Sequence, residues 1–182
     1  MEPIDALKRR EEAAIHWLVD SFSDRLLKAA TLMLSDQHLA EDAVQECFAA
    51  AITHLDKFRG DSSVYTWLYT ILLRCCGQLR KRSSRERVLP SEAMDGMLIQ
   101  QGAQRAEKDQ VMNWTVRNAV RKLKYKQREA VVLYYFEEFS IKEIAAILGE
   151  PEGTVKNRLH RARKALEKAL EKEDSYVAER AF

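Results

Sequence analysis

The stretch from Glu152 to Leu166, EGTVKNRLHRARKAL, decides how the rest of the chain is interpreted. Its apolar residues recur at spacings of three or four, which is typical of one buried stripe along an α-helix. These residues are Val155, Leu159, Ala162 and Leu166. The other positions are mostly basic or hydrogen-bonding, and no acidic side chain interrupts the run from Lys156 to Lys164. The stretch therefore predicts a helix with one packing face and a cationic remainder.

The residues before this helix complete a helix-turn-helix pattern. Residues 140–148, SIKEIAAIL, open with Ser140 and carry Glu143 three positions later, which is a capping box. Glycine and proline in the next three residues suit a left-handed turn and a first helical position. Such an arrangement places its second helix in the DNA major groove, where Arg, Lys and Asn match the base edges. The alternative is a solvated basic helix, since cations also suit helix C-termini.

Composition indicates an all-α protein. The chain has 182 residues, of which 46% are hydrophobic and 32% charged, with 6 Gly and 3 Pro. Good helix formers dominate, and long period-2 alternation is missing. No apolar run is long enough to cross a bilayer, and the N-terminus has no signal-peptide core. We therefore expect a cytoplasmic protein.

The distribution of charge is more informative than the net charge of +2. Residues 36–56 contain five acidic side chains and no Lys or Arg, whereas residues 74–87 contain six Lys or Arg and one Glu. Such blocks predict two different charged partners. The three cysteines, Cys47, Cys75 and Cys76, form no CxxC pair, so we expect buried reduced thiols.

Periodicity and breaker residues predict two small helical domains. Helical patterns over 5–34, over 39–56 and from Ser62 or Ser63 onward predict an N-terminal domain at 1–87. Residues 88–110 lack periodicity and predict a flexible linker, whose few apolar residues fit either a partner contact or a tether. Helices over 113–123 and 127–137 precede the helix-turn-helix, which gives a four-helix domain at 111–173. Residues 174–182 are a tail.

Two stretches of the N-terminal domain have functional alternatives. Residues 40–48, AEDAVQECF, place acidic and amide side chains on one helix face. That face suits a basic partner, an acidic metal cluster or solvent. Residues 58–82 place aromatic residues before a basic helix, a combination that suits unpaired bases, although the aromatic residues also suit a core.

The order of these stretches resembles a bacterial RNA polymerase sigma factor of the minimal, two-domain extracytoplasmic-function group. AEDAVQECF at 40–48, FRGDSSVYTWLY at 58–69 and SIKEIAAILGEPEGTVKNRLHRARKAL at 140–166 carry the resemblance, which extends from about Ala13 to Leu170.

The resemblance implies three sets of site residues. The core polymerase-binding set, which faces the β′ clamp helices, is Glu41, Asp42, Gln45, Glu46 and Phe48. The −10 set, which captures a flipped base and reads the melted strand, is Phe58, Arg59, Asp61, Ser62, Ser63, Arg74 and Gln78. The −35 set is Thr154, Lys156, Asn157, His160 and Arg161, with Arg158 and Arg163 at phosphates or in packing. Arg74 stands where the family often has Asn, so the −10 preference does not transfer.

The resemblance also implies the function and the partners. The expected protein directs core polymerase to promoters and stabilises the melted −10 element, with no catalytic residue, metal, cofactor or small-molecule substrate. Expected partners are core RNA polymerase (β′ clamp helices and β flap), promoter DNA and an anti-sigma factor. The protein would associate with the nucleoid when bound to polymerase, and an anti-sigma factor could hold it at the membrane.

Two other classes of protein remain open from the residues themselves. A helix-turn-helix repressor or activator would bind duplex DNA tightly by itself. A metal-dependent nucleic-acid enzyme would use Asp36, Glu41, Asp42 and Glu46. Against the enzyme, the four histidines are scattered and no metal-ligand spacing occurs.

Overall fold

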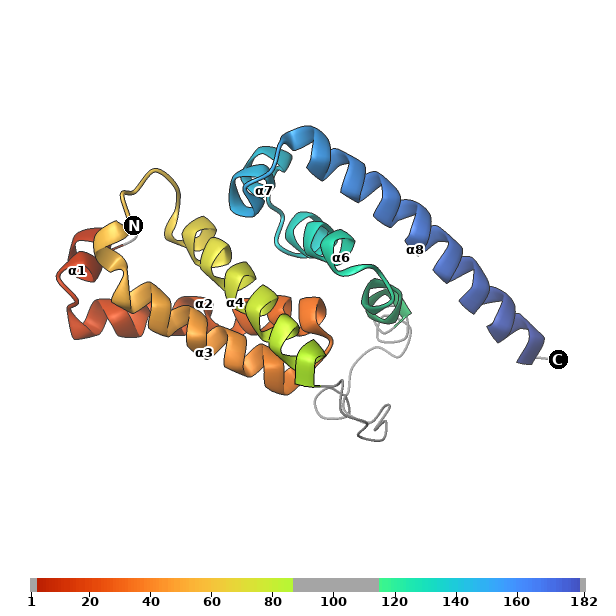
Figure 1. Cartoon of the computed structure of the whole chain (residues 1–182), viewed down its shortest axis with the longest axis horizontal. Coiled ribbons are helices and arrows are strands. Elements are labelled where there is room, and N and C mark those ends of the chain that lie inside the picture. The colour runs from red at the N-terminus through yellow and green to blue at the C-terminus, as the bar shows by residue number, and fades with distance from the viewer. Residues whose placement is uncertain (1–2, 87–114, 181–182) are drawn as a thin grey trace.

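The structure is a computed structural model that describes residues 3–86 and 115–180, all in helices and turns without a β-strand (Figure 1). The first helical region contains α1 (Ile4–Lys8), α2 (Glu12–Leu34), α3 (Gln37–Thr53), the 3-10 turn η1 (Leu55–Lys57) and α4 (Val64–Glu86). The second contains a helix at 115–121, α6 (Tyr125–Val131), the π-helical turn η2 (Val132–Phe136), α7 (Ile141–Leu148) and α8 (Glu152–Arg180). The all-α, two-region prediction is confirmed. The expected linker at 88–110 lies outside the described residues.

The first region is a bundle in which α3 packs against both α2 and α4. Each helix contributes apolar side chains at spacings of three or four, and these close over one core. Among the most deeply buried are Leu18, Leu26 and Met33 of α2, Ala43, Cys47 and Ala51 of α3, and Leu68, Leu72 and Cys76 of α4. No described helix is both long and apolar enough to cross a membrane.

Two predicted helix boundaries are wrong. The helix expected over 5–34 is interrupted between α1 and α2, where Arg10 has a left-handed φ of 57°. This break lets α1 fold back over η1 and bury Leu7, which is 1% exposed. Helix α3 begins at Gln37, because the Asp36 carboxylate accepts a hydrogen bond of 3.0 Å from the Leu39 amide. Glu41 and Asp42 therefore lie beyond its first turn.

The helix-turn-helix forms as the local signals predict. Ser140 accepts from the Glu143 amide, and the Glu143 carboxylate accepts from the Ser140 amide, so the capping box is confirmed. Gly149 ends α7 with φ 64°, a conformation that favours glycine. Val155 and Leu159 of α8 are fully buried and pack in the core shared with α7.

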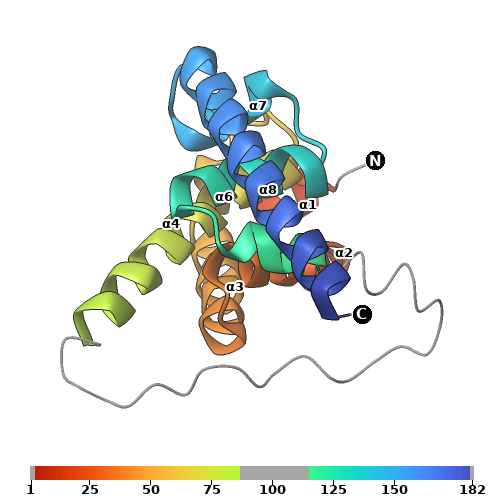
Figure 2. The same ribbon diagram turned by 90° about the vertical axis from the view of Figure 1, so that its right-hand side faces the viewer.

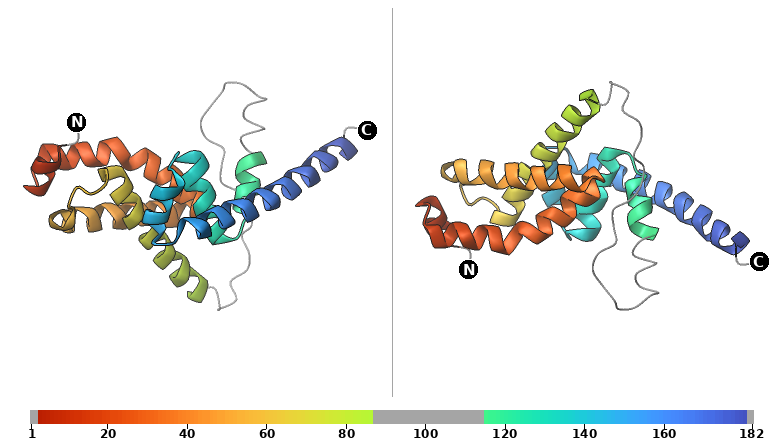
Figure 3. Two further views of the ribbon diagram at one scale, coloured as in Figure 1. Left: turned by 90° about the horizontal axis from the view of Figure 1, so that it is seen from above. Right: turned by 90° about the horizontal axis from the view of Figure 1, so that it is seen from below.

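The two regions lie in direct contact. Helix α4 packs on α7, while α2 packs on α6 and η2. Figure 2 shows the two regions against each other, and the views from above and below show α8 extending past the bundle toward the C-terminus (Figure 3).

Two glycine substitutions test the turn before α8. Gly149→Ala should lower the free energy of unfolding by about 1–2 kcal/mol, because alanine is strained at positive φ. Gly77→Ala is the matched control, since Gly77 lies within α4 and has open space around its Cα. It should raise the free energy of unfolding by about 0.5–1 kcal/mol. Urea unfolding followed by circular dichroism measures both. Equal effects of the two substitutions would contradict the role given to Gly149.

Candidate nucleic-acid interface

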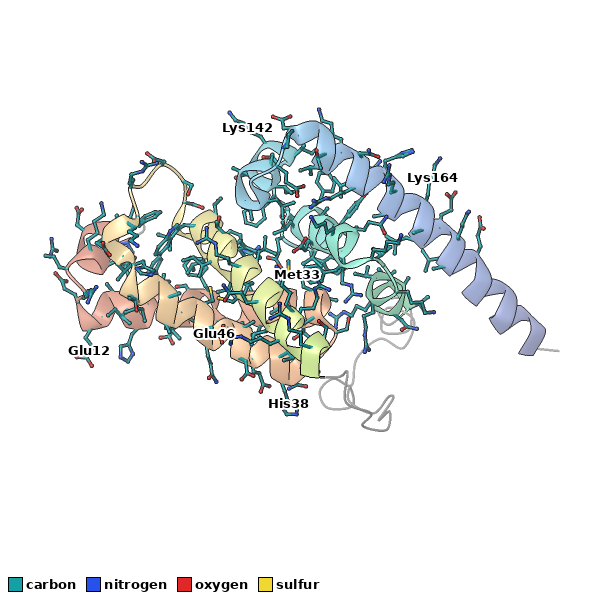
Figure 4. The ribbon with its side chains drawn as sticks, in the orientation of Figure 1. Glu12, Met33, His38, Glu46, Lys142 and Lys164 are labelled. Carbon is teal, nitrogen blue, oxygen red and sulfur yellow. The ribbon has the colours of Figure 1, made fainter. Side chains whose placement is uncertain are left out.

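The cationic face of α8 is open to solvent. All of the predicted −35 residues except Arg158 are exposed: Thr154, Lys156, Asn157, His160, Arg161 and Arg163. The Lys156 ammonium lies 3.8 Å from the Glu152 carboxylate one turn earlier, a weak surface pair that a stronger anion can displace. Figure 4 shows Lys164 pointing outward from the same helix. The helix thus presents donors in the arrangement that a major groove accepts.

Arg158 differs from its neighbours because its side chain is only 13% exposed. Its guanidinium donates to the Glu150 carboxylate in the turn before α8. Glu150 also lies 3.9 Å from the Lys126 ammonium of α6. Burial raises the pKa of the nearby Glu129 carboxyl, and the Arg158 charge opposes that rise. Arg158 therefore links α8 to the turn before it, and through Glu150 and Lys126 to α6.

The loop at 58–63 has one buried and several exposed members. Phe58 is 4% exposed, and its ring centroid lies 5.0 Å from that of Trp67. The Arg59 guanidinium donates to the Asp61 carboxylate across 2.9 Å, and Gly60 between them has φ 80°. The Ser63 hydroxyl accepts from the Thr66 amide at 3.1 Å, so the predicted cap of α4 is confirmed for Ser63. Phe58 anchors a loop whose polar tip faces solvent.

Helix α4 exposes the two predicted strand readers, Arg74 and Gln78. Trp67 lies seven residues before Arg74 and so shares its face of the helix. Arg74 also lines a polar cavity of about 410 Å³ between α4 and the second region, together with Glu150 and Arg158. The structure thus brings one predicted −10 residue beside the turn that precedes α8.

Two further aromatic side chains of α4 serve packing. Tyr69 is fully buried and Tyr65 partly buried, and burial raises the pKa of both phenols. The alternative that some of these aromatic residues belong to the core is therefore confirmed for Tyr69.

The acidic face of α3 contains exposed groups and groups engaged in hydrogen bonds or ion pairs. Asp42 and Gln45 are exposed, whereas Phe48 is 8% exposed and belongs to the core. The Glu41 carboxylate accepts from the Gln37 side-chain amide at 3.0 Å, and the Glu46 carboxylate lies 3.6 Å from the Arg82 guanidinium of α4. Among the described residues, no three His, Cys, Asp or Glu side chains gather as a metal site.

The three cysteines are free and buried, as the sequence predicts. Burial raises the pKa of the Cys76 thiol to about 12 and also raises those of Cys47 and Cys75. Since only thiolates are strong nucleophiles and ligands, these side chains act as packing groups.

An apolar groove of about 370 Å³ in the second region was not predicted from the sequence. Its lining comes from the helix at 115–121, from α6, from η2 and from α8. The apolar lining residues are Val116, Val120, Val131, Tyr135, Phe136, Leu166 and Leu170. Tyr135 is 49% exposed beside it. One feature of the sequence could have indicated this groove. The apolar positions of α8 continue past Ala162 to Leu166 and Leu170, and these two leucines line the groove.

Comparisons with known proteins agree with this division into two regions. The family model "Sigma-70 region 2" matches residues 18–86, and "Sigma-70, region 4" matches residues 114–166. The ECF RNA polymerase sigma factor SigW of Bacillus subtilis is 31% identical over 180 residues, covering 92% of this chain and 94% of that protein. The RNA polymerase sigma-H factor of Pseudomonas aeruginosa is 30% identical over 177 residues, covering 92% of each.

Two solved structures also resemble this chain. CnrH in complex with the cytosolic domain of CnrY has a TM-score of 0.68 and 25% identity, covering 92% of this chain and 94% of that one. The sigma factor RpoE in complex with the anti-sigma factor NepR from Bartonella quintana has a TM-score of 0.69 and 28% identity, covering 88% and 96%. Motifs, fold and relatives agree, and the chain belongs to the sigma-70 family of RNA polymerase sigma factors, in the extracytoplasmic-function group.

Proposed function

We propose a division of labour for this sigma factor in which residues 1–87 bind core polymerase and the melted −10 element, and residues 111–173 read the −35 element. The observation that carries the proposal is the exposed cationic face of α8, held by a capped helix-turn-helix within the matched sigma-70 region 4. The segment at 88–110 joins the two parts, and 174–182 is a tail.

At the −10 element, the loop at 58–63 would capture one unpaired base. Flipping a base costs a few kcal/mol of stacking, so the loop must be arranged before the base arrives. Phe58 in the core and the Ser63 cap support such an arrangement, and Arg59, Asp61 and Ser62 remain exposed. Arg74 and Gln78 would then contact the neighbouring melted strand. Because the protein prefers melted to duplex DNA, its binding shifts the promoter toward the melted form.

The partners follow the same division. The acidic face of α3 would contact the β′ clamp helices, and the β flap is a second polymerase contact. Two solved relatives are bound to CnrY and to the anti-sigma factor NepR, and we propose an anti-sigma factor for this chain too. Such a partner could hold the otherwise cytoplasmic protein at the membrane. Members of this family act in transcription initiation without catalysis, and we propose the same here, without cofactor or small-molecule substrate.

Run-off transcription tests the proposal as a whole. Core polymerase free of sigma factor is mixed with genomic fragments, including the region upstream of this gene, with and without this protein. Discrete transcripts that depend on the protein are expected, and their start sites locate both promoter elements. Absence of transcripts together with tight duplex binding by the protein alone would instead favour a repressor or activator.

Arg161→Ala and Lys156→Ala test the −35 assignment. Each should reduce −35-dependent transcription by roughly 5–150-fold, which corresponds to about 1–3 kcal/mol for a good base contact. Polymerase binding should be unchanged, because both side chains lie on the exposed face of α8. Lys168→Ala, an exposed lysine farther along α8, is the matched control and should have little effect. A parallel fall in polymerase binding would contradict the proposal that this face of α8 reads the −35 element.

Asp42→Asn tests the polymerase-binding face of α3. It removes one exposed carboxylate and keeps the size of the side chain, so affinity for core polymerase should fall by about 2–5-fold, as expected for an exposed charge pair. The loss should shrink at high salt. Binding to a −35 duplex should not change. Asp20→Asn on α2 is the control, and an equal loss in the control would show that only net charge matters.

A further inference from the structure

Arg158 occupies a different part of the α8 surface from the exposed −35 residues. It follows Val155 by three residues and precedes Ala162 by four, and both of these are fully buried. Arg158 therefore borders the packing face of the helix, and its side chain is largely buried. Asn157 and His160 lie opposite the buried stripe and are exposed. Arg158 is thus at the edge of the candidate −35 face and not at its centre.

The partner of Arg158 is Glu150, in the turn between α7 and α8. The Arg158 guanidinium donates to the Oε1 atom of the Glu150 carboxylate. The Lys126 ammonium of α6 lies 3.9 Å from the same oxygen. The other oxygen, Oε2, is buried and has no hydrogen-bond partner within the described residues. The Glu150 carboxylate therefore depends chiefly on Arg158, because a buried oxygen without a donor carries its full desolvation cost.

The backbone of Glu150 is fixed to the end of α7. Its amide donates to the Ala145 carbonyl at 3.0 Å, which closes the last turn of that helix. On the other side of the turn, the Thr154 amide donates to the Pro151 carbonyl at 2.9 Å and begins α8. The start of α8 lies beside α7 in Figure 1. The side-chain bond from Glu150 to Arg158 thus connects the end of α7 to the second turn of α8.

The charge of Arg158 is already engaged inside the protein. Besides Glu150, the Glu129 carboxyl of α6 lies close enough that the Arg158 charge opposes the rise in its pKa caused by burial. Glu129 is itself 9% exposed. Moving the guanidinium to a DNA phosphate would deprive two shielded carboxylates of their cation, which is unfavourable. This environment favours a role within the protein over a contact with the DNA backbone.

Apolar packing alone leaves part of the geometry of α8 undefined. Val155 and Leu159 are fully buried in the core shared with α7. Hydrophobic attraction is non-directional, so it fixes which face is buried more firmly than it fixes the tilt of the helix. A charge-assisted hydrogen bond has a preferred length and direction. Base contacts require donors to be held within about 0.5 Å of their productive positions, so a directional link matters here.

We propose that Arg158 and Glu150 are positioning residues for −35 recognition: their link between the two helices holds the exposed side chains of α8 against the base edges, and neither residue contacts DNA. The inference rests on the proposed function of α8 and deepens it. The link governs discrimination between base pairs, because a shifted helix loses base contacts while its exposed lysines and arginines still reach phosphates.

Glu150→Gln in the full-length chain separates positioning from simple electrostatics. The substitution removes a negative charge beside the DNA-binding face, so the electrostatic field alone would tighten binding to every duplex. Positioning instead predicts that affinity for the −35 duplex falls by about 3–10-fold, part of what one good base contact contributes. Affinity for a duplex with a scrambled −35 sequence should not fall. Fluorescence anisotropy titrations with both duplexes, taken from a promoter located by run-off transcription, measure this.

Glu152→Gln is the matched control for this charge change. It removes the same charge from an exposed residue in the first turn of α8. The ratio of its affinities for the −35 and scrambled duplexes should equal the wild-type ratio. Circular dichroism confirms that helix content is retained in each variant.

Arg158→Met tests the other member of the pair. It removes the guanidinium and keeps an extended side chain, and it should lower the ratio of the two affinities by a similar 3–10-fold. The slope of the logarithm of the binding constant against the logarithm of salt concentration should stay at the wild-type value, whereas loss of a phosphate contact would reduce it by about 0.9. The double variant should lose no more than the larger single loss, because both substitutions remove the same link.

The outcomes separate this inference from the function on which it rests. Tighter binding of Glu150→Gln to both duplexes, with the wild-type ratio, would overturn the inference. A salt slope reduced by about 0.9 in Arg158→Met, with equal losses on both duplexes, would also overturn it, since Arg158 would then contact a phosphate. Additive losses in the double variant would show that Arg158 does not act through Glu150. A wild-type chain without preference for the −35 duplex, and without run-off transcripts, would contradict the proposed function itself.

Discussion

Burial of the leucine stripe of α4 is the constraint on which the other surfaces depend. Leu68 and Leu72 are fully buried against α3, and this fixes the rotation of α4 about its axis. With that rotation fixed, Arg74 and Gln78 must face solvent, and Tyr65 must face α2 and the second region. A single helix thus serves the core and the contact between regions on one side, where Tyr65 lies seven residues before Leu72, and presents the candidate DNA face on the opposite side.

Features encoded within a few residues were predictable from the sequence. The capping box at Ser140, the left-handed Gly149 and the Ser63 cap each depend on backbone groups within three or four positions. The break between α1 and α2 was not predictable in this way, because it allows Leu7 to be buried where α1 packs on η1, which lies far along the chain. The docking of Phe139 between two tyrosines was equally hidden, because the partners are about seventy residues apart.

The type of a residue predicted what chemistry its side chain can do, but it did not predict whether the side chain is exposed. Phe58, Phe48 and Arg158 each fit a contact with a partner by type, yet their side chains are largely buried. Phe58 and Phe48 hold neighbouring exposed groups in place through packing, while Arg158 does so through its bond to Glu150. An interface of this kind needs rigid support beneath its exposed groups. A motif in the sequence contains both the supporting and the exposed residues and does not show which are which.

The buried thiols bear on how the cell could signal to this protein. Cys47, Cys75 and Cys76 are the only cysteines of the chain, and all three are held protonated inside the first bundle. Peroxides and disulfides react with accessible thiolates, so burial and the raised thiol pKa values both slow such reactions at these cysteines. Direct reaction of an oxidant with these three thiols would therefore require the first bundle to open.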